Sequence, residues 1–179
     1  KSRGVWRDDP DFRVHRKLGP EYDRLKERCD QTLAALDRLP VSDDIFDLTH
    51  NDVHPGNFFI DNGRMTVFDF DDCHYDFLVN DLAIALFYAL RDARVDQDDR
   101  QFARTFWDNL LNGYHEKHSL PKAQFDHVPL FLKLREFLLY ALLQIEAPDS
   151  DSPWCVRFMT NRKERIENAV PVIDIDFNQ

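Results

Sequence analysis

The sequence predicts an α+β fold that is mainly helical and contains one small β-hairpin. Two observations predict it: apolar residues recur every three or four positions over long segments, and an Asn-Gly pair separates two short segments of β-forming residues. The chain has 179 residues, of which 43% are hydrophobic and 31% charged. These values are ordinary for one globular unit with its own core, so we expect residues 1–179 to form a single domain.

The predicted helices follow from apolar spacing and from residues that start or stop helices. Pro20 starts the first helix and Pro40 ends it after residue 38, with apolar positions three or four apart between them. Residues 1–19 show no such period and are expected to form an irregular lead-in segment. Further helices are expected over four ranges: 81–91, 99–118, 129–147 and 153–169, the last after a Ser-Pro start at 152–153.

Two of these helices are apolar on nearly every face, which predicts that they are central and buried. They contain the sequences LAIALFYAL, within 81–91, and FLKLREFLLYALL, within 129–147. Elsewhere, Asn112 and Gly113 are expected to interrupt or bend the helix that contains them, because glycine weakens a helix interior.

The β-hairpin is predicted from two short segments on either side of an Asn-Gly turn: 58–60 and 65–70. Asn-Gly is the preferred central pair of a two-residue type I′ turn, because both positions need a positive φ. With this turn, Asn57 faces Phe68, and Asp69 lies one residue further on. The open end of the hairpin therefore brings Asn57 and Asp69 together.

Charge and cysteine content exclude several classes of function. Lys and Arg number 23 and Asp and Glu 33, a net charge of −10, so nucleic acid is not an expected partner. The longest apolar run, Leu82–Leu90, is nine residues, against about 20 for a membrane-spanning helix, so no membrane partner is expected. Three widely spaced cysteines without a CxxC pair, and no visible signal sequence, predict a cytoplasmic protein.

A cluster of polar residues follows the short apolar segment at 45–48. His50, Asp52 and Asn57 form the pattern H-x-D-x-x-x-x-N, and Asp69 opens the sequence Asp-Phe-Asp-Asp after the hairpin. Phosphoryl transfer to a hydroxyl needs a carboxylate that orients the acceptor, and hard oxygen ligands that hold Mg²⁺ against the phosphates. Asp52 suits the first role, and Asn57 with Asp69 suits the second.

These motifs resemble those of the aminoglycoside phosphotransferase, choline kinase and homoserine kinase group, whose fold is protein-kinase-like. The family's HGDxHxxN is matched by HNDVHPGN, in which Asn51 replaces the usual glycine. Its DFxD motif is matched from Asp69 to Asp71. Further on, the sequence Asn-Asp-Leu-Ala, which contains Asp81, resembles the family's D-L-A helix start.

The resemblance implies a transfer of the γ-phosphoryl group of ATP, with Mg²⁺, to a hydroxyl of a small molecule. It assigns the following roles: Asp52 orients the acceptor and takes its proton, Asn57 and Asp69 bind metal and nucleotide, Asp71 neighbours the metal, and His50 and Asp81 hold the loop. The likeness covers only the C-terminal lobe of these kinases, and no G-x-G-x-x-G is present. We therefore expect this chain to be that lobe, inactive or nearly so without an N-terminal lobe that clamps ATP.

Other interpretations stay open at this level. His50, Asp52 and His54 alternate along the chain and could form the metal site of a hydrolase, and a kinase-like module could bind a partner without catalysis. The acceptor is not identified: an aminoglycoside, choline, homoserine, another small alcohol or a protein serine all fit. The run DFDDC followed by the DLA helix is most similar to the homoserine kinases.

Four further charged residues have two interpretations each. Asp72 and Asp76 could contact a cationic acceptor, although solvated acidic loops are more common. Arg135 and Glu136 lie inside the most apolar helix, where a buried charge needs a partner or a role. They are expected either to form structural ion pairs or to line the acceptor pocket.

Overall fold

The structure, a computed structural model, describes residues 10–92 and 99–178. Its 3₁₀ helices (η), α-helices and strands follow in this order: η2 (Pro10–Lys17), η3 (Pro20–Tyr22), α1 (Asp23–Leu36), β1 (Phe46–Thr49), β2 (Phe58–Asp61), β3 (Arg64–Val67), β4 (His74–Phe77), α2 (Leu78–Asp92), α3 (Asp99–His115), η4 (Lys122–His127), α4 (Val128–Glu146), α5 (Pro153–Met159) and α6 (Arg162–Glu167). The described part of the molecule is mainly helical, as predicted, and has two small antiparallel sheets where the sequence predicted one hairpin. Within the described residues, no helix is long and apolar enough to cross a membrane.

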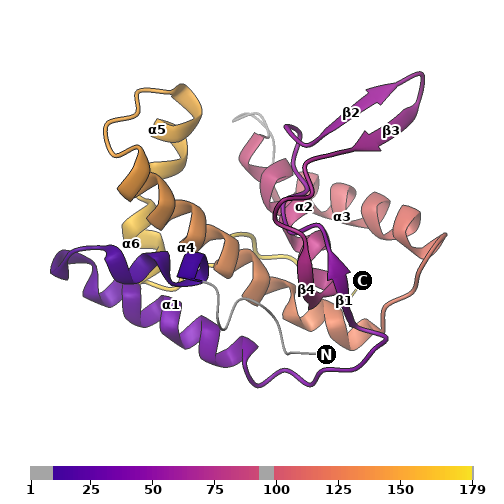
Figure 1. The fold of residues 1–179 in the computed structure, drawn as a ribbon, viewed down its shortest axis with the longest axis horizontal. Helices are drawn as coiled ribbons and strands as arrows, with labels where there is room; N and C mark the ends of the chain where they lie inside the picture. Colours follow the sequence, from indigo (N-terminus) through magenta and orange to yellow (C-terminus); the bar gives the residue numbers. More distant parts are fainter. Residues whose placement is uncertain (1–9, 93–98, 179) are drawn as a thin grey trace.

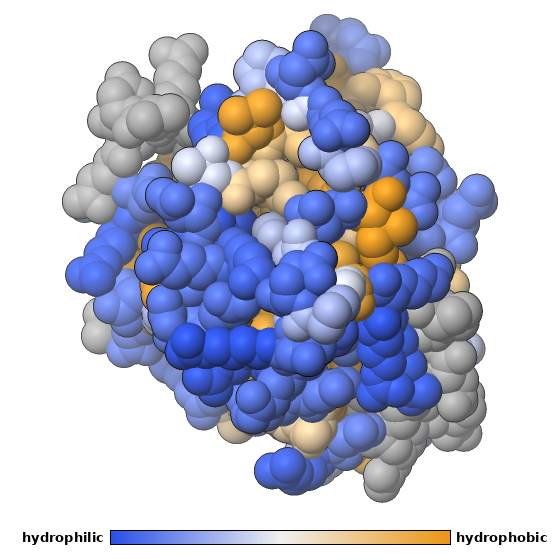
Figure 2. Space-filling model, turned by 90° about the vertical axis from the view of Figure 1, so that its left-hand side faces the viewer, coloured by the Kyte–Doolittle hydropathy of each residue, from blue (hydrophilic) through white to orange (hydrophobic). Residues whose placement is uncertain are grey.

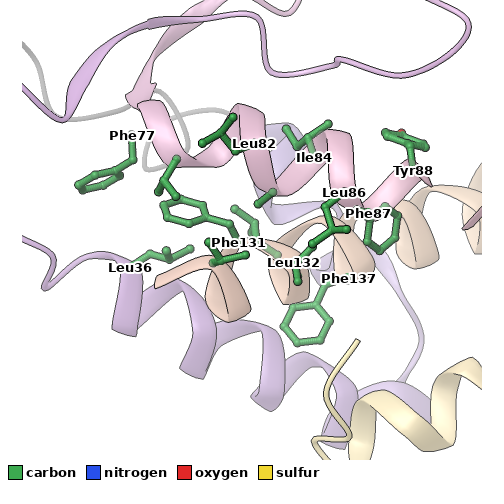
Figure 3. Packing of buried hydrophobic residues seen from close by; sticks show 14 of the residues in the cluster. Leu36, Phe77, Leu82, Ile84, Leu86, Phe87, Tyr88, Phe131, Leu132 and Phe137 are labelled. Carbon is green, nitrogen blue, oxygen red and sulfur yellow. The ribbon is translucent and has the colours of Figure 1, made fainter. Parts of the chain in front are cut away.

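The centre of the fold is α4, which packs against α2 on one side and α1 on the other (Figure 1). Figure 3 shows side chains of α2, among them Leu86 and Phe87, lying over Leu132 and Phe137 of α4. All four are buried, Leu86 completely. Burial on several faces explains why these two helices are apolar nearly all round, and it confirms their predicted central position.

The first sheet joins β1 to β4 and was not predicted from the sequence. The two strands run antiparallel, with Phe46 paired to Phe77 and Thr49 to His74. Because β4 continues directly into α2, this pairing fixes the end of β1 beside the start of α2. The segment that follows β1, residues 50–57, is therefore held next to the first turn of α2.

The second sheet is the predicted hairpin, β2–β3, and its register is confirmed. Phe58 pairs with Val67, and the N–H of Phe68 donates to the carbonyl of Asn57 at 3.0 Å. The turn residues Asn62 and Gly63 both have positive φ, 48° and 76°, as a type I′ turn requires. The second strand ends at Val67 rather than at residue 70, because Asp69 takes a left-handed φ of 63° that interrupts an extended strand.

The hairpin projects from the body of the molecule (Figure 1) and exposes apolar side chains. On it and directly after it, five of them are more than two fifths exposed: Phe59, Ile60, Met65, Phe68 and Phe70. The face of the molecule formed by α1 and α5 is mostly hydrophilic, unlike the hairpin, and its apolar atoms lie mainly in the upper half of the view (Figure 2). Large exposed apolar side chains gathered on one hairpin are typical of a contact with another chain segment or ligand.

Three predicted elements need correction. The expected helix 153–169 is two helices, because Asn161 adopts a left-handed φ of 55° between α5 and α6. The Asn112-Gly113 pair does not interrupt α3, which continues to His115. The lead-in segment is not irregular throughout: residues 10–17 form a 3₁₀ helix that packs on α4, while residues 1–9 lie outside the described part.

The buried His15 gives the fold a pH dependence. His15 is 2% exposed, and burial lowers its pKa below the ordinary 6.5, although the nearby Asp30 carboxylate opposes this shift. In the unfolded chain His15 binds a proton as the pH falls through about 6.5, whereas in the folded chain it binds one only at lower pH. The free energy of unfolding therefore falls as the pH drops below 6.5. We expect a slope of at most about 1.4 kcal/mol per pH unit from this group.

Urea unfolding at several pH values between about 5 and 8 measures this slope. The matched variant is His15→Gln, which keeps a polar side chain of similar length and cannot titrate. Its free energy of unfolding should fall less steeply toward low pH than that of the wild type. Parallel curves for the two proteins would contradict the assignment to His15.

Candidate active site

The loop that carries the sequence motif, residues 50–57, is anchored to α2 by Asp81. The two carboxylate oxygens of Asp81 accept hydrogen bonds from the backbone N–H groups of His50 and Asn51, each at 2.8 Å. Burial raises the pKa of Asp81, while these two N–H groups favour its charged form and offset part of that shift. The loop thus starts at a fixed point on a helix that is itself packed in the core.

Asn51 occupies the position at which the family motif has glycine. Its backbone conformation explains why asparagine can replace glycine there. Its φ is 64°, in the left-handed region that glycine adopts freely and that asparagine tolerates best among other residues. Its side chain is buried, accepts a hydrogen bond from Asn80 at 2.8 Å and donates to Thr49. Asparagine therefore keeps the glycine conformation and adds a side-chain network.

His50 connects the loop to the hairpin. Its Nδ1 accepts from the N–H of Asp52 at 3.3 Å, so Nε2 carries the proton and donates to the carbonyl of Phe68 at 3.1 Å. The ring also packs against Phe70, 4.8 Å between centroids. Both ring nitrogens are used by the backbone, so His50 has none left for the metal site of the hydrolase interpretation.

Asp52 is contacted at both carboxylate oxygens. Oδ1 accepts from the Arg135 guanidinium, while Oδ2 accepts from Asn57 Nδ2 at 2.9 Å and lies 3.2 Å from Nε2 of His54. The side chain is 19% exposed. The carboxylate is thus held in one orientation while part of it stays accessible.

The oxygen ligands predicted for a metal lie at the open end of the hairpin. Asn57 uses its Nδ2 for Asp52, donating to both the carbonyl and the carboxylate, so its Oδ1 is left as an acceptor. Asp69 and Asp71 are exposed, and in the described part of the chain no hydrogen bond or ion pair is assigned to either carboxylate. An amide oxygen and free carboxylates are the hard ligands that Mg²⁺ prefers, so these residues fit a divalent metal.

A cavity of about 630 Å³ opens beside Asp52. Its polar side includes Asp52, Asp71, Asp72 and Arg135, and its apolar side is formed mainly by leucines of α4: Leu134, Leu138, Leu139 and Leu142. Asp69, Asn57 and His50 do not line it. Of the predicted metal ligands, only Asp71 reaches the cavity, which it shares with Asp52.

The four charged residues that had two interpretations divide between lining the cavity and forming structural contacts. Asp72 lines the cavity, whereas Asp76 is fully buried and accepts from the N–H of Phe77 and the side chain of Asn80, a structural role. Glu136 forms a buried ion pair with Arg162 at 2.6 Å. Arg135 instead reaches into the cavity.

Sequence reasoning did not connect Arg135 to Asp52, nor did it single out Tyr88. The Tyr88 hydroxyl accepts from Arg135 at 2.6 Å, and its ring packs against His54 with 4.9 Å between centroids. The only signal available was a charge in an apolar helix, because the contact joins residues 83 positions apart.

Fold and site together define the class of protein. A model of the phosphotransferase enzyme family matches residues 2–119, and the chain belongs to this family. It is 32% identical over 179 residues to amicoumacin kinase of Bacillus subtilis (strain 168), an alignment that covers 99% of this chain and 53% of that protein.

Two solved structures share the fold. The first is amicoumacin kinase hAmiN in complex with AMP-PNP, Ca²⁺ and Ami, with a TM-score of 0.87 and 29% identity over 98% of this chain and 53% of that one. The second is a microcompartment-associated aminopropanol kinase, with a TM-score of 0.60 and 21% identity over 88% of this chain and 49% of that one. The chain thus spans about half the length of the relatives it matches.

The left-handed backbone of Asn51 makes a stability prediction. Asn51→Gly keeps this conformation and loses the side-chain hydrogen bonds, which should lower the free energy of unfolding by about 1–2 kcal/mol. Asn51→Ala loses the same bonds and adds the cost of a left-handed alanine, about 1–2 kcal/mol more. Urea unfolding of the two variants measures the difference, and an alanine variant as stable as the glycine variant would contradict it.

Proposed function

We propose that the protein containing this chain transfers the γ-phosphoryl group of ATP to a hydroxyl of a small molecule. The observation that carries the proposal is the Asp52 carboxylate, held at both oxygens and open to a 630 Å³ cavity. Such a carboxylate accepts the hydrogen bond of the acceptor hydroxyl and takes its proton as the bond from oxygen to phosphorus forms. His50 and Asp81 keep the loop in place through backbone contacts.

Nucleotide and metal belong to the same proposal. The relative solved with AMP-PNP and Ca²⁺ supports a nucleoside triphosphate and a divalent metal at this fold. Here Asn57 Oδ1, Asp69 and Asp71 would hold Mg²⁺, which supplies neutralisation of the phosphate charge. Because two of these ligands are exposed carboxylates at the surface of the chain, the phosphates would complete the coordination shell.

We further propose that this chain is the C-terminal lobe of a longer enzyme. Two observations support this: the chain spans about half of its relatives, and the hairpin exposes several large apolar side chains near the proposed metal ligands. An N-terminal lobe that closes over ATP would cover some of these side chains. The chain alone would then lack half of the nucleotide site and show little activity.

The cavity also bears on the acceptor. Its leucine wall favours an acceptor with an apolar part, and the carboxylate of Asp72 at its polar side favours an amino group. The names of the relatives, amicoumacin kinase and aminopropanol kinase, support a small amine-bearing alcohol. We therefore propose an acceptor of this type rather than a protein serine.

Activity should depend on the Asp52 carboxylate. The full-length protein, given Mg²⁺ and ATP, is tested for ADP formation and acceptor phosphorylation with amicoumacin, aminopropanol, choline, homoserine and an aminoglycoside. Asp52→Asn should lower kcat by about 10²- to 10⁴-fold, the usual contribution of a positioned base, while ATP binding is retained.

The matched control is Asp23→Asn, which changes an exposed carboxylate on α1 and should leave kcat unchanged. If Asp52→Asn keeps wild-type kcat, the proposed role is wrong. If the wild type binds no ATP in the presence of Mg²⁺, a kinase-like binding module is the better description.

The metal ligands make a separate prediction. Asp69→Asn should raise the Mg²⁺ concentration needed for half-maximal activity by about 10- to 100-fold, because a charge-assisted contact of about 1.5–3 kcal/mol is weakened. Mg²⁺ titrations with and without ATP measure this, and binding should be weak without nucleotide. Tight Zn²⁺ binding that is lost in His54→Ala, without any need for ATP, would support the hydrolase interpretation instead.

A further inference from the structure

One cationic side chain of the site, Arg135, comes from α4 rather than from the motif. Its neighbour Glu136 is paired with Arg162 on another side of the helix, so the two adjacent charges serve different surroundings. The Arg135 side chain is 19% exposed, and a cation so placed in an apolar helix is retained only with partners. Its partners are Asp52 and Tyr88.

These contacts fix the guanidinium in place. One terminal nitrogen donates both to Asp52 Oδ1 and to the hydroxyl of Tyr88, the latter at 2.6 Å. The guanidinium carbon also lies 5.0 Å from the centre of the Tyr88 ring, within the range of a cation–π contact. Tyr88 is 5% exposed and packs against His54, so it is a rigid support.

The occupancy of the Asp52 carboxylate points to the position of the acceptor. A carboxylate offers about four acceptor sites, two on each oxygen. Arg135 donates one hydrogen bond to Oδ1, whereas Oδ2 accepts one from Asn57 and has the His54 ring nitrogen 3.2 Å away. Oδ1, next to the guanidinium, is therefore the less crowded oxygen for an acceptor hydroxyl.

Arg135 also has donor capacity left. Its Nε is buried and has no hydrogen-bond partner among the described residues, and the side chain lines the cavity beside Asp52. A hydroxyl oxygen bound at Oδ1 would lie against this guanidinium. A fixed cation there holds the carboxylate and the acceptor oxygen together.

We propose that Arg135, supported by Tyr88, is a positioning residue that directs the acceptor hydroxyl to Oδ1 of Asp52; this rests on the proposed function. In the reaction the hydroxyl oxygen bonds to the γ-phosphorus, and the bond from that phosphorus to the bridging oxygen breaks. ADP leaves with the electron pair of that bond, and the hydroxyl proton passes to Asp52. Arg135 neither gains nor loses a proton.

The test compares Arg135→Met, Arg135→Lys and Tyr88→Phe in the full-length protein, with the acceptor that gives the highest wild-type turnover among amicoumacin, aminopropanol, choline and homoserine. Arg135→Met should lower kcat by about 10- to 100-fold. The KM for ATP with Mg²⁺ should change less than twofold, because the described contacts of Arg135 do not include Asp69 or Asp71. Lysine should restore part of kcat.

Tyr88→Phe removes one hydroxyl, keeps the ring and should lower kcat by about 3- to 10-fold. It keeps the proposal testable if Arg135→Met does not fold. The matched control is Arg162→Met, which breaks the other ion pair of α4. It should lower the Tm at least as much as Arg135→Met, with an unchanged kcat per folded molecule.

The outcomes separate the two levels of the proposal. If Asp52→Asn abolishes turnover but Arg135→Met and Tyr88→Phe keep wild-type kcat, or exceed it, the positioning role is overturned while the kinase stands; higher activity would show that Arg135 restrains Asp52 instead. If Arg162→Met lowers kcat per folded molecule as much as Arg135→Met does, Arg135 is a structural residue only. A wild type that neither binds ATP nor phosphorylates any of these acceptors overturns the proposed function, and the role of Arg135 with it.

Discussion

The position of the loop at residues 50–57 depends on one carboxylate, that of Asp81. Its two oxygens hold the consecutive N–H groups of His50 and Asn51 and thereby fix the loop to the first turn of α2. Because α2 is buried against α4, the position of the loop is determined by the packing of the core rather than by the loop's own short sequence. The cost is a partly buried acidic group with a raised pKa, a shift that the two N–H donors partly offset.

Local patterns predicted most of the fold. The spacing of apolar residues located α1, α2 and α4 to within a few residues, and the Asn-Gly turn gave the hairpin with its register, because both signals are contained in short windows. The β4 strand was missed because its sequence HYDF becomes a strand only by pairing with β1, far away in the chain. The break at Asn161 was missed because a left-handed asparagine leaves little trace in apolar spacing.

The site was predictable only where its chemistry is written in consecutive residues. The H-x-D-x-x-x-x-N pattern brings Asp52 and Asn57 into contact, and the hairpin register places Asp69 one residue beyond the backbone hydrogen bond that joins Phe68 to Asn57. The role of Arg135 could not be read in this way, because 83 residues separate it from Asp52. The sequence shows only that a charged residue lies in an apolar helix. It does not show which residue that charge contacts.

The adjacent charges of Arg135 and Glu136 also determine the rotation of α4 about its own axis. A helix that is apolar on almost every side can pack in several rotational settings with similar burial. Successive residues of an α-helix point about 100° apart, so turning α4 by one residue in one direction would bring Glu136 toward Asp52, and turning it in the other direction would bring Arg135 toward Arg162. Both encounters place like charges together out of water, which costs several kcal/mol. Opposite charges at adjacent positions thus select one setting of the central helix, the one in which the cavity beside Asp52 is lined by leucines and one arginine.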